Sequence, residues 1–114
     1  MINIFEKINF KNGIISNNSV KIFENVLLKN QTFNLTQDIV QIYYVVENKE
    51  YTIDLGWYPE DFEVTEESYF WIRIIEDDIW DNILFERKCT DIQELISNME
   101  EAILWCSRAA AKLD

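Results

Sequence analysis

Residues 40–57 read VQIYYVVENKEYTIDLGW and contain two runs of alternating side chains. The first run places Val40, Ile42 and Tyr44 on one side of an extended backbone, and the second does the same with Ile53 and Leu55. Alternation with a period of two residues is typical of β-strands. A polar break at residues 47–50 separates the runs. The stretch therefore predicts two antiparallel strands joined by a short turn.

The same reasoning predicts more strands on both sides of this stretch. Residues 69–75 form a nearly continuous β-branched and aromatic run, and residues 83–89 alternate again, so a four-stranded meander is expected. Near the start of the chain, Asn12-Gly13 stands between apolar residues, which is typical of a β-hairpin turn. Residues 20–28 fit either a strand or a short helix, and residues 29–38 are expected to form a loop.

The last quarter of the chain carries a helical pattern. Apolar residues recur at helical spacing from Ile92 to Leu113, which predicts an amphipathic helix of about six turns. Thr90 and Gln93 have the spacing of a capping box at its start. The expected fold class is therefore α+β, with an antiparallel β-sheet (meander) packed on a long C-terminal α-helix. At 114 residues the chain is expected to form a single domain, residues 1–114.

Charge is distributed very unevenly along the chain. Residues 1–50 hold five acids and five bases, so the whole net charge of −11 comes from residues 51–114. Between Pro59 and Asp81 nine carboxylates accompany one cation, Arg73, and several aromatic residues. A surface of one sign attracts partners of the opposite sign and speeds their encounter, while aromatic side chains anchor a docked partner. A simple pair of solvated loops beside a buried strand is the alternative.

This pattern gives a set of candidate partner-binding residues. Acids would steer and pair with a basic protein, and Tyr58, Phe62 and Trp80 would anchor it. Direct binding to nucleic acid or to a membrane is not expected, because phosphates and anionic lipids repel such a surface. The full candidate set is Tyr58, Glu60, Asp61, Phe62, Glu63, Glu66, Glu67, Glu76, Asp77, Asp78, Trp80 and Asp81.

Residue types that common active sites require are scarce. The chain has no histidine, which removes the usual catalytic triads and zinc sites, and only two glycines, too few for a phosphate-binding loop. Carboxylates such as Glu76 and Asp78 could in principle serve a glycosidase or bind calcium, but neither the scaffold nor the spacing favours this. No catalytic residue, metal or cofactor is therefore expected.

The two cysteines and the start of the chain suggest a compartment. Cys89 precedes the helix and Cys106 lies about 22 Å along it, too far for a disulfide. Charged Glu6 and Lys7 interrupt the start, where a signal peptide would be apolar, and no membrane span is predicted. A cytoplasmic protein with two reduced thiols is expected.

The segment Asp54-Leu55-Gly56-Trp57-Tyr58-Pro59, the strand at 69–75, the isolated Trp80 and the helix from Asp91 together resemble a known group of proteins. They are similar to the small immunity proteins of bacterial polymorphic toxin and contact-dependent growth inhibition systems, over roughly residues 38–104. The resemblance implies a protein without enzymatic activity that binds and blocks the toxin domain of its own cell lineage. The acidic composition agrees with a basic toxin, for example a nuclease.

Two other classes of function stay open at this point. One is a nucleic-acid mimic that inhibits a host protein, for which the acids should be spaced like duplex phosphates. The other is a small carboxylate-dependent enzyme or ligand carrier, for which the acids should converge on a pocket. The oligomeric state is expected to be a monomer or a weak dimer.

Overall fold

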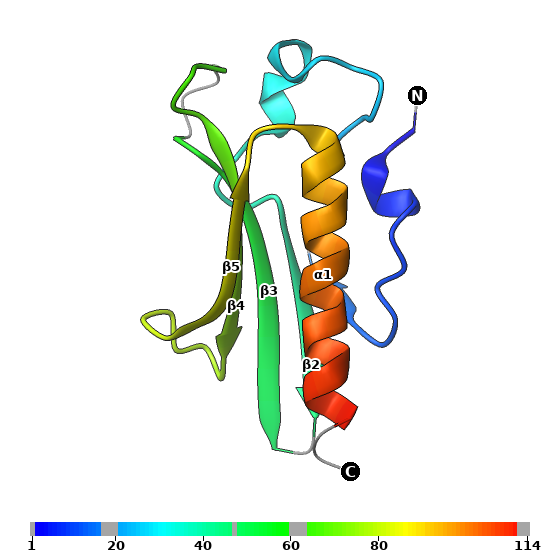
Figure 1. Cartoon of the computed structure of the whole chain (residues 1–114), viewed down its shortest axis with the longest axis vertical. Helices are drawn as coiled ribbons and strands as arrows, with labels where there is room; N and C mark the ends of the chain where they lie inside the picture. The colour runs from blue at the N-terminus through cyan, green and yellow to red at the C-terminus, as the bar shows by residue number, and fades with distance from the viewer. Residues whose placement is uncertain (1, 17–20, 47, 60–63, 112–114) are drawn as a thin grey trace.

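A computed structural model describes residues 2–16, 21–46, 48–59 and 64–111 of the chain, and for residues 109–111 it describes the backbone alone. Five antiparallel strands form one sheet in the order β1-β2-β3-β4-β5, and a single long helix, α1, lies against it (Figure 1). The strands are β1 (Ile14–Ser16), β2 (Val40–Val46), β3 (Lys49–Tyr58), β4 (Tyr69–Glu76) and β5 (Ile83–Cys89), and α1 spans Ile92–Ala111. The predicted α+β meander with a C-terminal helix is confirmed.

Strand pairing follows the alternation that the sequence carries. Ile53 lies opposite Ile42 on β2 and Ile74 on β4, so apolar residues of neighbouring strands meet on the same side of the sheet. β5 departs from regular pairing near its start. Ile74 pairs with Phe85 but Ile75 pairs with Ile83, so Leu84 is the extra residue of a β-bulge. The regular part of β5 is therefore Phe85–Cys89.

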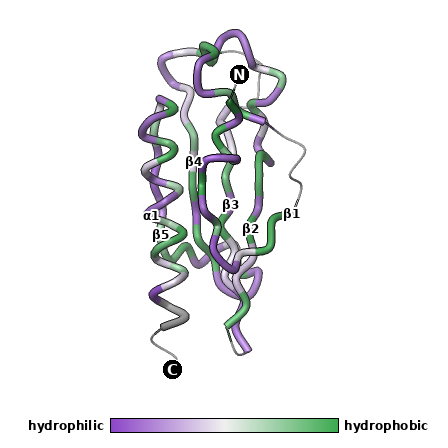
Figure 2. The backbone as a smooth tube through the Cα atoms, turned by 90° about the vertical axis from the view of Figure 1, so that its right-hand side faces the viewer, coloured by the Kyte–Doolittle hydropathy of each residue, from purple (hydrophilic) through white to green (hydrophobic). Residues whose placement is uncertain are grey.

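The N-cap of the helix lies one residue after Thr90, the N-cap that the sequence predicts. Asp91 caps it, because its Oδ1 accepts a hydrogen bond of 2.8 Å from the backbone N–H of Glu94. The Thr90 capping box was thus wrong by one position. In Figure 2 the helix alternates between hydrophilic and hydrophobic residues along its length. Its apolar stripe buries Leu95, Met99, Ala102, Ile103 and Cys106 in the hydrophobic core.

The sheet has two different faces. The helix face is the one that α1 covers: the Tyr51 ring meets the Trp105 ring of α1 with centroids 5.7 Å apart, and Arg87 pairs with Glu101 of α1 at 2.5 Å. The open face points away from α1. Its residues in β2–β5 are Gln41, Tyr43, Val45, Thr52, Asp54, Gly56, Tyr58, Tyr69, Trp71, Arg73, Ile75, Ile83, Glu86 and Lys88.

The N-terminal segment differs from its prediction. A turn does form at Asn12-Gly13, where the Gly13 N–H donates to the Phe10 carbonyl at 3.0 Å, but residues 8–10 form no strand. β1 pairs with β2 instead, so the predicted local hairpin was wrong. The apolar residues before the turn pack elsewhere, because Ile4 and Ile8 belong to the hydrophobic core. The N-terminal segment that carries them runs beside α1 (Figure 1).

Residues 21–38 form turns and short 3₁₀ helices, Leu28–Asn30 and Thr32–Asn34, at one end of the sheet. The Gln37 carbonyl reaches the open face at Gly56, and a Cβ added to Gly56 would lie 2.3 Å from it. Glycine at position 56 therefore permits a close backbone approach that any side chain would block.

Both cysteines are free and buried. Burial raises the pKa of the Cys89 thiol to about 11 and that of Cys106 to about 12. In the part of the chain that the structure describes, α1 included, no helix is long and apolar enough to cross a membrane.

Candidate functional site

The centre of the open face holds a buried ion pair. Asp54 on β3 lies opposite Arg73 on β4, and the Arg73 Nη2 donates to Asp54 Oδ2 at 2.6 Å. The Asp54 side chain is only 2% exposed and that of Arg73 17%. A buried charge requires a partner and further hydrogen bonds, and the two neighbouring strands supply them.

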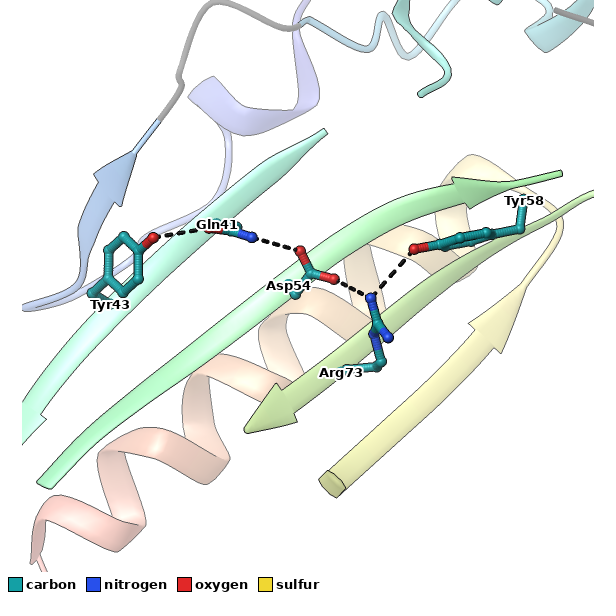
Figure 3. A network of polar contacts seen from close by, with 5 residues as sticks. All are labelled: Gln41, Tyr43, Asp54, Tyr58 and Arg73. Carbon is teal, nitrogen blue, oxygen red and sulfur yellow. Dashed lines mark hydrogen bonds and ion pairs between the residues drawn. The ribbon is translucent and has the colours of Figure 1, made fainter. Parts of the chain in front are cut away.

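Hydrogen bonds extend this pair across three strands (Figure 3). Gln41 on β2 donates from Nε2 to Asp54 Oδ1 at 3.1 Å and accepts from the Tyr43 hydroxyl at 2.8 Å. On the other side, Arg73 Nη2 also donates to the Tyr58 hydroxyl at 3.3 Å. Both carboxylate oxygens of Asp54 are thus occupied, and the orientation of Arg73 is fixed by side chains on its own sheet.

Aromatic rings surround the guanidinium. Its carbon lies 4.2 Å from the centre of the Trp71 ring and 5.6 Å from that of Trp80, which belongs to the turn after β4. Tyr58 packs edge-on against Trp71, with ring centroids 5.5 Å apart. Partial burial raises the pKa of Tyr58, although the nearby Arg73 charge opposes the shift. We call Asp54, Tyr58, Trp71, Arg73 and Trp80 the arginine cluster.

A second cation borders the arginine cluster. Lys88 on the edge strand β5 lies opposite Trp71, and its Nζ is 4.9 Å from the centre of that ring and 5.2 Å from that of Tyr69. Such contacts of a cation with an aromatic face are weakly attractive at an exposed site. Trp71 therefore lies between two positive charges in a protein whose net charge is −11.

Two of the predicted anchors belong to this cluster, and the remaining one is outside the described residues. Tyr58 and Trp80 converge on Arg73 from different segments. Phe62 lies outside the described residues, as do the acids Glu60, Asp61 and Glu63. Glu66 and Glu67 are exposed. They lie in a turn that is closed by a hydrogen bond of 3.2 Å from the Ser68 N–H to the Thr65 carbonyl.

The other predicted acids surround the turn between β4 and β5. Glu76 forms an ion pair of 3.3 Å with Lys49. Asp77 joins this turn to the β2–β3 hairpin, because its Oδ1 accepts from the Glu50 N–H at 2.9 Å and its own N–H donates to the Glu50 carbonyl at 2.8 Å. Asp78 and Asp81 are exposed. These four acids thus divide into two with internal partners and two that face solvent.

The fold separates the acidic residues into two groups. β4 lies between Glu66-Glu67 and the turn at residues 77–82, and its eight residues span about 25 Å. The two turns consequently lie at opposite ends of the strand (Figure 1). One run of acids in the sequence becomes two acidic ends of the open face, with the arginine cluster between them.

Sequence reasoning identified Tyr58 and Trp80 but missed the other members of the cluster. Asp54 is the only charged residue in the predicted run 51–57, and Arg73 is the only one in the run 69–75. They stand four residues before Tyr58 and four residues after Tyr69, and those two tyrosines pair across the strands. An antiparallel pairing through Tyr58 and Tyr69 would have placed the two charges opposite each other.

Four hollows on the described surface have none of the predicted acids in their lining. A hollow of about 420 Å³ lies between α1 and the N-terminal segment, lined by Lys11, Glu100, Glu101 and Leu104 among others. None of the predicted partner-binding residues lines it. Across the described ranges, no group of three or more His, Cys, Asp or Glu residues could hold a metal ion.

Comparison of the chain with protein families, with curated proteins and with solved structures found no match.

Proposed function

We propose that this protein is a cytoplasmic inhibitor of the immunity type, which binds a basic toxin domain of its own cell lineage and blocks it without catalysing a reaction. The open face of the sheet is the docking surface in this proposal. The arginine cluster anchors the toxin, and the two acidic ends steer it.

The observation that carries the proposal is the composition and position of the arginine cluster. Arginine, tryptophan and tyrosine are the residues most enriched among those that dominate binding energy at protein interfaces. Here they are gathered on the side of the sheet that α1 leaves uncovered, and Trp80 is 43% exposed. The Asp54 pair and the ring contacts also fix Arg73 in place, so little conformational entropy remains to be lost on binding.

The charges favour a basic partner. Asp54 neutralises Arg73, so the centre of the face adds little net charge, whereas Asp78 and Asp81 at one end and Glu66 and Glu67 at the other are exposed. Complementary charges at the rim of an interface mainly raise the association rate and reject wrong partners. A toxin with basic residues around an apolar centre fits this arrangement.

The positions of the acids also weigh against the carboxylate-dependent enzyme. Catalysis by a carboxylate pair needs the two groups within about 5–10 Å of each other across a substrate site. Those predicted acids that the structure describes project from turns at opposite ends of β4 or are held by a hydrogen bond or an ion pair within the protein. This distribution favours recognition of a large surface.

The test uses the toxin domain encoded by the reading frame directly upstream, produced with and without this protein. Trp80→Ala should weaken binding at least about 30-fold by calorimetry and reduce protection of toxin-expressing cells. Leu104→Ala is the matched control, because Leu104 is 42% exposed but lies on α1. The proposal fails if the upstream product does not bind, or if Leu104→Ala impairs binding as much as Trp80→Ala does.

A further inference from the structure

The outer edge of β5 is a second surface on which a partner can dock. β5 ends the sheet, and among the described strands none pairs with it on the side away from β4 (Figure 1). The opposite edge strand, β1, has only three residues, whereas β5 has seven. An edge strand presents backbone N–H and C=O groups that no neighbouring strand pairs, which form a template for another strand. In β5 the Glu86 carbonyl accepts a hydrogen bond of 2.8 Å from Arg87 Nη1, so pairing there requires this side chain to share or release the carbonyl.

The bulge in β5 limits which pairing can form. The strand is regular from Phe85 to Cys89, and Arg87 is the middle residue of that segment. Two copies that pair antiparallel through a two-fold axis at Arg87 align the whole regular segment. In any other symmetric register fewer regular residues would pair, because part of the segment would lie opposite the bulge or beyond the end of the partner strand.

Charge selects the same register independently. Glu86 and Lys88 both point to the open face, since they lie opposite Arg73 and Trp71. With the axis at Arg87, Glu86 of each copy lies directly opposite Lys88 of the other, which gives two opposite-charge pairs. An axis at Glu86 or at Lys88 would instead place identical charges opposite each other, which is destabilising.

Arg87, the residue on the two-fold axis, already has a counter-charge within its own chain. Arg87 would lie opposite its own copy on the helix face, but its Nη2 is 2.5 Å from the Glu101 Oε1 on α1, and its guanidinium carbon is 4.3 Å from the centre of the Phe85 ring. Each Arg87 thus carries its own counter-charge into the contact.

We infer that two copies of this protein pair through their β5 edges, antiparallel about Arg87, and form one continuous ten-stranded sheet. This inference rests on the edge strand and does not depend on a toxin. Five residue pairs make a small interface, so the dimer is weak and depends on protein concentration. The two open faces would lie side by side on the same surface of the joined sheet.

The test is sedimentation equilibrium of the full chain from about 10 µM to about 1 mM at about 0.15 M salt. The wild type should approach twice the monomer mass, and Glu86→Lys should weaken dimerisation about tenfold because two attractive pairs become repulsive. Glu100→Lys on α1 is the control. It makes the same change in net charge away from the edge, and it should leave dimerisation unchanged or strengthen it.

The decisive variant exchanges the two charges. Glu86→Lys combined with Lys88→Glu keeps the net charge and restores both opposite-charge pairs, so it should recover the wild-type dimerisation constant within about twofold. Circular dichroism would verify that each variant folds. A wild type that stays monomeric throughout, a Glu86→Lys variant that dimerises as before, or a double variant that does not recover would each overturn the inference.

Discussion

The two faces of the sheet are built in different ways from the same strands. The helix face is apolar, and Ile53, Leu55 and Ile72 on it have no exposed surface. The open face carries an ion pair, a chain of side-chain hydrogen bonds and an arginine packed on an aromatic ring. Burial of the first face against α1 accounts for folding through the hydrophobic effect. The second face carries polar and charged residues whose presence this burial does not explain.

The Asp54–Arg73 pair shows this difference most clearly. Well-packed apolar residues in place of a buried ion pair are often as stabilising as the pair itself. Fixing the orientation of an arginine beside an exposed aromatic ring, here Trp80, is useful for recognition. The comparison therefore assigns stability to the helix face, whereas recognition by the open face is our proposal.

Truncation on the helix face should have the largest effect on stability. Ile103→Ala should lower the free energy of unfolding by about 2–5 kcal/mol, because Ile103 is buried and its loss leaves a cavity. On the open face, Val45→Ala should change it by less than about 0.5 kcal/mol, since Val45 is 63% exposed. Urea unfolding measures both, and equal losses would remove the distinction between the faces.

Replacing each member of the ion pair in turn should show which loss lowers the free energy of unfolding more. Arg73→Met leaves the buried Asp54 carboxylate with only the Gln41 hydrogen bond, and should cost about 2–3 kcal/mol, near the low end for buried pairs. Asp54→Asn should cost about 1 kcal/mol, because the amide oxygen still accepts from Arg73 and water reaches the guanidinium. Unfolding of the two variants in urea tests this order, and a stable Arg73→Met variant would contradict it.

Alkaline pH should lower the stability of the fold through the two buried thiols that pack on the helix face. The buried thiols hold their protons more tightly than the unfolded chain does, since their pKa values lie near 11 for Cys89 and 12 for Cys106 against an ordinary 9.0. The unfolded state therefore loses protons first, and the contribution of the thiols to stability should be constant well below pH 9 and fall as pH rises toward 11–12. Urea unfolding at about pH 8 and about pH 10 measures the loss, which Cys106→Ala should reduce. An unchanged loss in that variant would exclude Cys106 as a cause.

The smallest expected effect is a gain in stability at the acidic turn. Asp77 and Asp78 have φ values of 51° and 60°, the pattern of a type I′ turn, in which glycine is preferred at the second central position. Asp78→Gly should therefore stabilise the fold by about 0.5 kcal/mol. If the turn also steers the toxin, the same variant should associate more slowly at low salt. Stopped-flow mixing measures that rate, and an unchanged rate would limit the role of Asp78 to solvation.

Much of the fold could be predicted because its elements are encoded locally. Alternation over 40–46 and 51–57 and helical spacing from Ile92 onward depend only on near neighbours. The prediction of a hairpin at Asn12-Gly13 was wrong because tertiary contacts determine the structure on both sides of the turn. The residues before the turn pack into the core, and those after it pair with β2. The arginine cluster was mostly missed because it assembles across strands. Asp54 and Arg73 are 19 residues apart, and their contact depends on register.

The most direct test of the central claim is a titration of the isotope-labelled chain with the upstream toxin domain, followed by NMR. The indole N–H signals of Trp71 and Trp80 and the amides of Tyr58 and Arg73 should shift, while those of Glu100 and Leu104 on α1 should not. That result would place the toxin on the open face. Shifts confined to α1 and the N-terminal segment, with the two indoles unchanged, would contradict the account.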